Sequence, residues 1–206
     1  MRRHTFDKLM TTAGAVAVVG LIVAGSLLWW GHRFADSNVA DRLRPQKISF
    51  STVDKLTAEE KAIPGVVGYA GQAVDDGQKA KVYSDVINLH LQSVNNGKTY
   101  SETSNESRAN PNDTALADKV QTLFRGETLR GLLLNAYAWW FVGRIAMYAA
   151  FAAFIGAALI ALLVAFGFVH MRKVSPVDEI DSLIELGASH PANGKASPET
   201  KVTASA

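Results

Sequence analysis

The hydrophobic positions of this chain are concentrated in two uncharged blocks separated by a polar stretch. The first block, residues 13–30, reads AGAVAVVGLIVAGSLLWW, and the second, residues 145–169, reads IAMYAAFAAFIGAALIALLVAFGFV. A helix over the second block is about 37 Å long at 1.5 Å per residue, which exceeds the ~30 Å of a bilayer core. The pattern therefore predicts two transmembrane helices, 13–30 and 145–169, with a polar domain between them.

The first block fits either a cleaved signal peptide or an uncleaved signal anchor, because basic residues precede it in both classes. The apolar run is longer than the core of a typical signal peptide and ends in a tryptophan pair, and no convincing A-x-A cleavage site follows it. These features favour a signal anchor. Residues 1–12 are then a cytoplasmic N-terminal tail.

The short flanks of the two blocks predict the orientation in the membrane. Lys and Arg in short flanks are retained in the cytoplasm, and here they are Arg2, Arg3 and Lys8 before the first block and Arg172 and Lys173 after the second. Both termini are therefore predicted to be cytoplasmic, with residues 31–144 outside the cell. Three arginines beyond the first block weaken this bias. The tail 170–206 is predicted to be disordered from about residue 187, where it becomes rich in Ala, Ser, Pro and Thr.

Residues 31–144 predict a small, mainly α domain with little or no sheet. Thr57 and Glu60 form a capping box that begins a short helix, and apolar residues at three and four residue spacing predict a helix over 78–94, closed by Asn-Asn-Gly. A further helix is expected over about 113–124, after a polar loop over 98–112. A connector helix, 128–144, then either stands on the second span or lies along the membrane surface, with Gly143 as the easiest place to bend.

Two tryptophan pairs, each followed by an arginine, suggest where the membrane ends. Trp and Tyr are enriched at membrane interfaces, and arginine reaches from a helix end to lipid phosphate. The alternative, Arg144 at mid-membrane, costs about 2.5–3.5 kcal/mol on insertion scales and ignores the apolar window that starts at the next residue. The six residues are therefore predicted to form a matched collar at the outer surface: Trp29, Trp30, Arg33, Trp139, Trp140 and Arg144.

Small residues recur inside both spans at four-residue spacing. Such stripes let helices approach closely in lipid, where apolar burial alone gives little drive to associate. One interpretation is that alanine is simply frequent in such a chain. The other is that these faces join the two helices to each other or join protomers, through Ala149, Ala153, Ala157, Ala161, Ala165 and Gly156 in the second span and Gly20 and Ala24 in the first.

Composition and motifs exclude several function classes. The net charge of +2 lacks the basic clusters of nucleic-acid binding, and the absence of cysteine removes disulfides and thiolate sites. Among five histidines, His32 lies at the outer end of the first block and only His90 lies within the folded part of the domain, and none has a metal-ligand partner at suitable spacing. His90 is predicted to be a half-buried structural residue. Gly97-Lys98-Thr99 resembles the end of a phosphate loop, but a glutamine stands where its first glycine is required. No catalytic residue, cofactor or metal site is predicted.

Three segments, Leu89 to Leu91, Gly97 to Glu102 and above all Thr122 to Trp139 (TLFRGETLRGLLLNAYAW), resemble a family of two-pass actinobacterial membrane proteins of unassigned function. The resemblance covers most of residues 10–170. It implies an inner-membrane protein of a mycobacterium-like or streptomycete-like cell. Members of the family are sometimes labelled aromatic ring-opening dioxygenases, but this chain lacks the histidine and carboxylate pattern that such an iron site requires.

The leading functional hypothesis is a non-enzymatic integral membrane protein that serves as an interaction or accessory module in the cell envelope. Its expected partners are the lipid bilayer and a membrane protein or a second copy of the chain. The alternative is a hydrolase or transferase acting on envelope lipid, with the polar loop covering a site near the outer interface.

Overall fold

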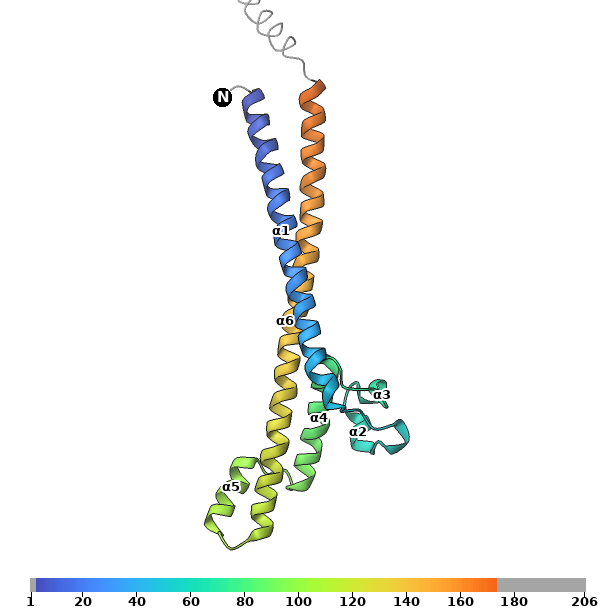
Figure 1. The fold of residues 1–206 in the computed structure, drawn as a ribbon, viewed down its shortest axis with the longest axis vertical. Coiled ribbons are helices and arrows are strands. Elements are labelled where there is room, and N and C mark those ends of the chain that lie inside the picture. Colours follow the sequence, from blue (N-terminus) through green and yellow to red (C-terminus); the bar gives the residue numbers. More distant parts are fainter. Residues whose placement is uncertain (1–2, 174–206) are drawn as a thin grey trace, which may run out of the picture. The chain divides into compact units, whose positions relative to one another are not determined.

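The computed structural model describes residues 3–173, so most of the predicted C-terminal tail, including the part from residue 187, lies outside the described residues. The described chain is mainly helical and contains no strand, only an isolated antiparallel bridge between Ser49 and Ala73. The helical class is therefore confirmed. The elements in order are α1 (Arg3–Leu43), η1 (Arg44–Gln46), η2 (Val53–Lys55), α2 (Ala58–Ala62), α3 (Val66–Tyr69), α4 (Gly77–Val94), α5 (Tyr100–Ala109) and α6 (Thr114–Lys173) (Figure 1).

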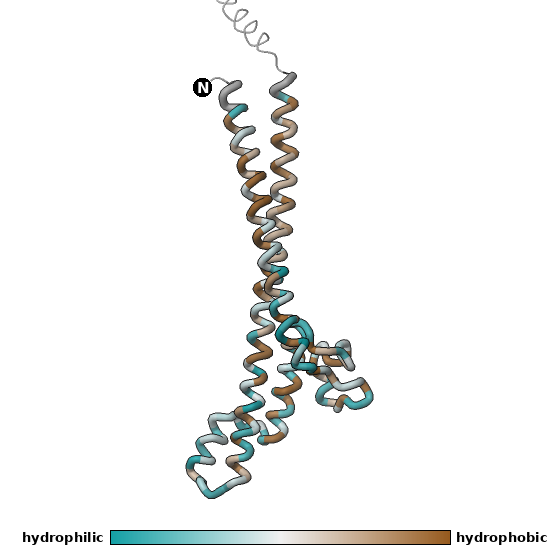
Figure 2. Tube along the Cα trace, in the orientation of Figure 1, coloured by the Kyte–Doolittle hydropathy of each residue, from teal (hydrophilic) through white to brown (hydrophobic). Residues whose placement is uncertain are grey.

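Both predicted spans lie inside the two longest helices, α1 and α6. Each helix is long and apolar enough to cross a membrane, and only 6% of the most apolar window of each is buried inside the protein. Figure 2 shows the hydrophobic colouring along these parts of α1 and α6, in contrast to the polar colouring around α5. A core helix of a soluble protein buries most of such a window, so the exposure of these two favours an apolar environment around them.

α6 is one continuous helix from Thr114 to Lys173. The sequence predicted separate helices over 113–124 and 128–144, with Gly143 as the easiest place for a bend. The break between the two helices is absent, and α6 is also continuous through Gly143, so the connector extends the second predicted span. Gly126 and Gly143 are instead positions of close approach, because an added Cβ would lie 2.4 Å from the Leu91 side chain and 2.9 Å from the Ala35 Cβ, respectively. These glycines are explained by packing against neighbouring helices rather than by chain bending.

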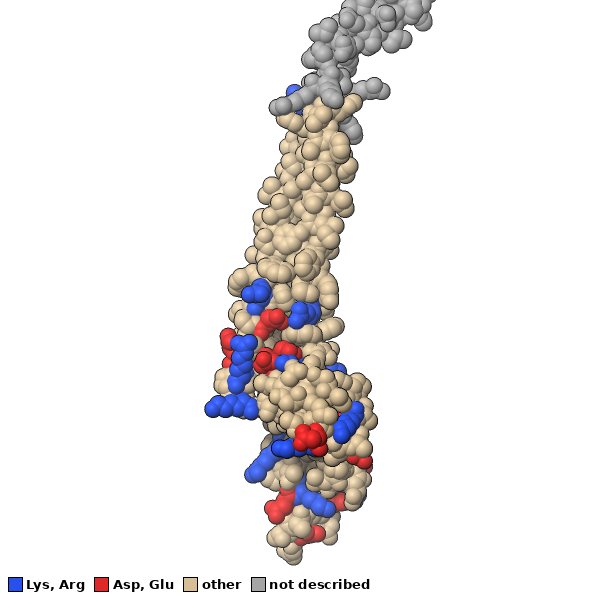
Figure 3. All heavy atoms as spheres, turned by 90° about the vertical axis from the view of Figure 1, so that its right-hand side faces the viewer, with Lys and Arg blue, Asp and Glu red and all other residues tan. Residues whose placement is uncertain are grey.

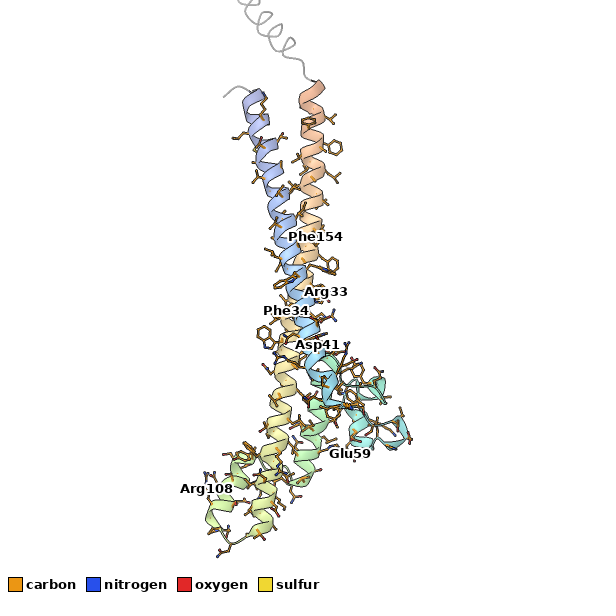
Figure 4. All side chains as sticks on the ribbon, viewed as in Figure 1. Arg33, Phe34, Asp41, Glu59, Arg108 and Phe154 are labelled. Carbon is orange, nitrogen blue, oxygen red and sulfur yellow. The ribbon has the colours of Figure 1, made fainter. Side chains whose placement is uncertain are left out.

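The chain divides into two compact units. The described part of the first comprises residues 3–17 and 159–173, and the second is Val18–Ala158. Within the first unit, Gly14 packs against Val164 and Gly167 against Thr11. Within the second, Gly25 packs against Phe154, which is labelled in Figure 4. In each unit, therefore, residues of α1 meet residues of α6 in antiparallel order.

The hydrophobic core of the second unit is assembled from both long helices and the segments between them. Its buried residues come from α1, from the irregular segments that follow it, from α3, from α4 and from α6: Val39, Leu43, Phe50, Leu56, Val66, Val74, Ala80, Val82, Val86 and Leu133. Trp140 of α6 packs against this cluster. α4 and α6 are antiparallel, because Gly77 meets Trp140 at one end and Gly126 meets Leu91 at the other. The small domain is thus built directly on α1 and α6.

Local sequence signals for this domain are confirmed in α2 and α4 and are wrong for α5. The Thr57 capping box is formed, and α4 begins one residue before its predicted start, with Asn96 and Gly97 at positive φ after its end. Residues 98–112, predicted to be a polar loop, instead contain α5. Its capping box joins Thr99 and Glu102, with the Glu102 backbone N–H donating to Thr99 Oγ1 at 3.2 Å. The same Thr-x-x-Glu signal that identified α2 also begins α5.

Candidate functional site

A cavity of about 540 Å³ lies between the end of α1 and the middle of α6, within the second unit. Ligand pockets in proteins have volumes of roughly 300–1,000 Å³, so this one is large enough for a small molecule or part of a lipid. Its walls are formed by Phe34, Ala35, Asn38, Val39, Arg42, Leu43, Gln46 and Ile48 from the α1 side and by Leu129, Leu132, Leu133, Asn135, Ala136 and Trp139 from α6. We call this cavity the α1/α6 pocket.

The lining is apolar with a small polar set. Phe34, Leu132 and Trp139 expose 54%, 63% and 59% of their surface, so the pocket has an open apolar mouth. The polar members are one arginine and three amides: Arg42, Asn38, Gln46 and Asn135. The lining includes no serine, histidine or carboxylate. This chemistry is suited to holding an apolar group beside an acceptor or an anion, and it offers no nucleophile or general base.

Arg42 is held in place on the helix that carries it. Its Nε–H donates to Asn38 Oδ1 at 2.8 Å, one turn earlier on α1. This bond leaves both terminal amino groups of the guanidinium without a protein acceptor in the described part of the chain. Arg42 forms no ion pair with a described carboxylate. A guanidinium in this state is the natural partner for a carboxylate or phosphate.

An exposed apolar face of α1 leads to the pocket from the predicted span. Val23, Leu27, Trp30 and Phe34 follow one another at spacings of four, three and four residues, so they lie on one side of the helix, and each exposes at least half of its surface. The rings of Trp30 and Phe34 stack with centroids 5.7 Å apart. Phe34, labelled beside Arg33 in Figure 4, therefore joins this face to the pocket wall.

The six predicted collar residues do not lie at one level. In the second unit Trp29 contacts Phe151, with ring centroids 5.7 Å apart, and Ala35 lies opposite Gly143. This antiparallel register places Arg33 level with Arg144. The same register places Trp29 and Trp30 on the side of the apolar segments and Trp139 and Trp140 on the side of the domain. The matched collar is thus corrected: the arginines match, and the tryptophan pairs lie on opposite sides of them.

Arg144 contacts one side chain of the domain and one of the predicted span. Its guanidinium carbon is 4.7 Å from the centroid of the Trp140 ring, a cation–π contact, and Nη1 approaches Met147 Sδ at 3.7 Å. Buried polar atoms without a hydrogen-bond partner among the described residues are His32 Nδ1, Asp36 Oδ1, Arg130 Nε and Arg144 Nε. Three of these four occur where α1 crosses α6, next to the level of the arginines. This crossing is therefore more polar than the helix segments before it.

The small residues predicted to pack between helices differ in their burial. Ala157 is buried and Ala153 and Gly156 are partly buried, while Ala149, Ala161 and Ala165 are exposed, as are Gly20 and Ala24. Each step of four residues turns an α-helix by 40° beyond a full circle, so a stripe at strict four-residue spacing leaves the contact face after two or three steps. Gly156 does face α1, with a Leu21 methyl 3.7 Å from the position of an added Cβ, and the contact face also includes Gly14 and Gly25, which the predicted set omitted. Ala150, likewise omitted, is fully buried. Sequence spacing of three and four in alternation identifies this face.

His90 and Glu60 form a contact that sequence spacing did not predict. His90 Nε2 lies 2.8 Å from Glu60 Oε1, and the histidine side chain is 58% exposed rather than half-buried. The Glu60 carboxylate also accepts a bond from the Thr57 backbone N–H at 2.8 Å. That bond first, and the bond from His90 after it, lower the pKa of Glu60. The pair joins α2 to α4, and no group of three or more His, Cys, Asp or Glu suited to a metal ion occurs within residues 3–173.

Charged side chains are distributed over the second unit. Figure 3 shows lysines, arginines and acidic residues interspersed over the face turned to the viewer, with no single-sign patch. On α6, Glu127 and Arg130 form an ion pair, with 3.0 Å between Arg130 Nη1 and Glu127 Oε2. Exposed pairs of this kind are worth little. The α1/α6 pocket is therefore the feature of this unit best suited to selective binding.

Comparison with known proteins found no matching family model, no matching curated protein and no matching solved structure.

Proposed function

We propose that the chain is a two-pass membrane protein of the cell envelope whose domain, residues 31–144, acts as a non-enzymatic interaction or accessory module. The observation that carries this proposal is the shared core: Val39 and Leu43 of α1 and Leu133 of α6 are buried in one cluster with α4. The two helices that are apolar enough to span a membrane therefore continue into the domain itself. A rigid domain held by two anchors at the bilayer surface suits the binding of neighbours.

The basic flanks support the orientation. Under the positive-inside rule, Lys and Arg before α1's apolar segment and after that of α6 favour both ends in the cytoplasm and the domain outside. The proposed resemblance to two-pass actinobacterial membrane proteins is the ground for proposing the inner membrane as the location. The proposal includes the lipid bilayer as a partner.

A membrane-protein partner or a second copy of the chain is the other proposed partner. Gly20, Ala24, Ala149, Ala161 and Ala165 are exposed within the described chain. Small residues on a lipid-facing surface permit close approach of another helix. These exposed small residues, which contacts within the chain leave uncovered, are therefore the surfaces that we propose for packing between protomers.

The alternative hypothesis, a hydrolase or transferase acting on envelope lipid, no longer has the polar loop that suggested it. It required a polar loop over a site near the membrane, and that segment contains α5. The α1/α6 pocket, which lies nearer the apolar segments, is lined by amides and one arginine among apolar side chains. Binding without turnover is the simpler use of such a lining.

Topology is tested by inserting a reporter that is active only outside the cytoplasm. The turn between α5 and α6, after Pro111, is an exposed site that interrupts neither helix, and the C-terminus is the comparison site. We expect activity from the insertion after Pro111 alone. The reverse pattern would overturn the orientation.

Purification of the full chain in mild detergent tests the interaction module. We expect a reproducible partner or a homo-oligomer to be isolated with it, and reduced association when Ala161 and Ala165 are both replaced by leucine. Replacing Leu162 and Leu163, which are exposed leucines beside them, with isoleucine is the matched control. A monomer without any associated protein would contradict the module.

A further inference from the structure

We propose that the α1/α6 pocket binds one acyl chain of an anionic phospholipid, with the lipid phosphate at Arg42. This inference rests on the proposed function only in taking the lipid from the outer leaflet. The binding site itself follows from the pocket and its lining. The occupant is identified by three observations: an apolar wall, an apolar route from the predicted span, and a cation with free donors.

The wall determines which part of the ligand is apolar. Phe34, Val39, Leu132 and Trp139 present side chains without formal charge around a cavity of about 540 Å³. A hydrocarbon chain leaves water when it enters such a cavity, and the gain scales with the apolar area covered. A polar metabolite could form hydrogen bonds only with the amides and Arg42, and it would leave the apolar walls of the pocket without apolar contacts.

The route determines where the ligand comes from. The exposed face through Val23, Leu27, Trp30 and Phe34 runs from the apolar segment of α1 to the pocket wall. The level of Arg33 and Arg144 lies beside Phe34 in the antiparallel register of α1 and α6. A lipid lying against this face reaches the pocket by moving its chain along a continuous apolar surface. A water-soluble ligand has no need of such a face.

Arg42 determines the charge of the headgroup. It lies on the pocket lining with its Nε–H bonded to Asn38, so its two terminal amino groups are available to phosphate oxygens. Asp36 and Asp41, the carboxylates nearest to it in α1, are absent from the lining. Gln46 and Asn135 supply further hydrogen-bond donors to the same pocket. An anionic phosphodiester satisfies this set, and a headgroup that also carries a cation satisfies it less well.

Native mass spectrometry of the full chain released from detergent micelles tests the site. The probes are phosphatidylglycerol and phosphatidylcholine with identical acyl chains, each titrated separately. We expect the first phosphatidylglycerol to be retained in preference to the first phosphatidylcholine. Arg42→Gln is expected to weaken this first association about tenfold, because hydrogen bonds to a charged group are lost.

The chain offers a matched control for each variant. Arg33 is an exposed arginine on the same helix that does not line the pocket, so Arg33→Gln is expected to retain the first phosphatidylglycerol. Leu132→Trp places a larger side chain at the pocket mouth and is expected to weaken both lipids. Leu134→Trp alters an exposed leucine of α6 outside the lining and is expected to change neither. Helix content by circular dichroism confirms that each variant is folded.

Several outcomes would overturn the site. Equal retention of the two lipids, or equal losses for Arg42→Gln and Arg33→Gln, would mean general adsorption to the surface. Unchanged binding in a folded Leu132→Trp chain would place the lipid elsewhere. A protein partner that protects Trp139, an exposed residue of the lining, from oxidation in the lipid-free complex would assign the pocket to that partner. Because the assay uses micelles, lipid binding and topology are tested separately: a reversed reporter pattern contradicts the orientation and leaves this result standing.

Discussion

Replacing Gly77 with alanine should destabilise the domain more than any other single methyl addition at a glycine of the second unit. A Cβ on Gly77 would lie 2.2 Å from the Trp140 Cβ and 2.5 Å from its Cγ, whereas carbon atoms in contact are ordinarily about 3.5–4.0 Å apart. The Trp140 Cβ moves only with the backbone of α6. The φ of Gly77 is not positive, so the whole cost is steric.

The expected magnitude follows from overpacking in a core. Such changes typically cost about 1–3 kcal/mol, and the rigid neighbour places Gly77→Ala near the upper end. For a chain of this length, ~2–3 kcal/mol lowers Tm by about 5–10 °C. The assay is thermal unfolding of the full chain in detergent, followed by tryptophan fluorescence, with hydrogen exchange of the α4 amides as a second measurement.

Gly131→Ala is the matched control, because Gly131 lies inside α6 with nothing within 4 Å of an added Cβ. Alanine in a helix interior is favoured over glycine by about 0.5–1 kcal/mol, so this variant should be slightly more stable than the parent chain. A Gly77→Ala chain that unfolds within a degree of the parent would refute the proposed packing of α4 on α6. Equal losses in both variants would do so as well.

Three further predictions concern local features of the chain. Thr99→Ala should lower the stability of α5 by about 1 kcal/mol through loss of its N-cap, seen as faster hydrogen exchange over this helix alone. The pKa of Glu60 is lowered by hydrogen bonds in the folded chain. The ionised carboxylate therefore stabilises the fold above its unfolded pKa of about 4.3, and this stabilisation is lost as the pH falls through the folded pKa. Glu60→Gln should flatten this dependence of Tm on acid pH. The chain has no cysteine, so engineered pairs test the register of α1 on α6. Ala35→Cys with Gly143→Cys should form an intramolecular disulfide on mild oxidation, because the two Cβ positions are 2.9 Å apart and a small separation of the helices brings them to the roughly 3.5–4.5 Å of a disulfide. Gly31→Cys with Gly143→Cys should stay reduced.

The sequence predicted the elements whose signal is local or compositional. Two long uncharged segments are enough to indicate α1 and α6, and the spacing of apolar residues in 78–94 is enough to indicate α4. The Thr57 capping box fixes the start of α2 because both of its hydrogen bonds lie within four residues. Such features need no knowledge of the tertiary fold.

The remaining features depend on contacts between distant segments. α5 carries few apolar residues, so it lacks the periodicity by which α4 was found, and only the Thr99 to Glu102 capping box marked its start. Gly126 and Gly143 occur inside the continuous α6 because Leu91 and Ala35 occupy the space that a side chain would take. The α1/α6 pocket joins segments about ninety residues apart, and no local spacing identifies it.

The tryptophan pairs show how helix direction changes the meaning of a repeated motif. Trp-Trp followed by arginine occurs in both long helices, but α1 and α6 are antiparallel in the second unit, so equal order in sequence becomes opposite order in space. With Trp29 beside Phe151 and Gly143 beside Ala35, the two pairs are separated by about ten residues, or ~15 Å of helix rise. The headgroup region on one side of a bilayer is only about 5–8 Å thick. One interface therefore cannot hold both pairs. In the proposed membrane arrangement, the level shared by Arg33 and Arg144 is the outer boundary of the bilayer, with Trp29 and Trp30 on its membrane side. Trp139 and Trp140 then lie on the domain side, where one lines the pocket and the other contacts Arg144.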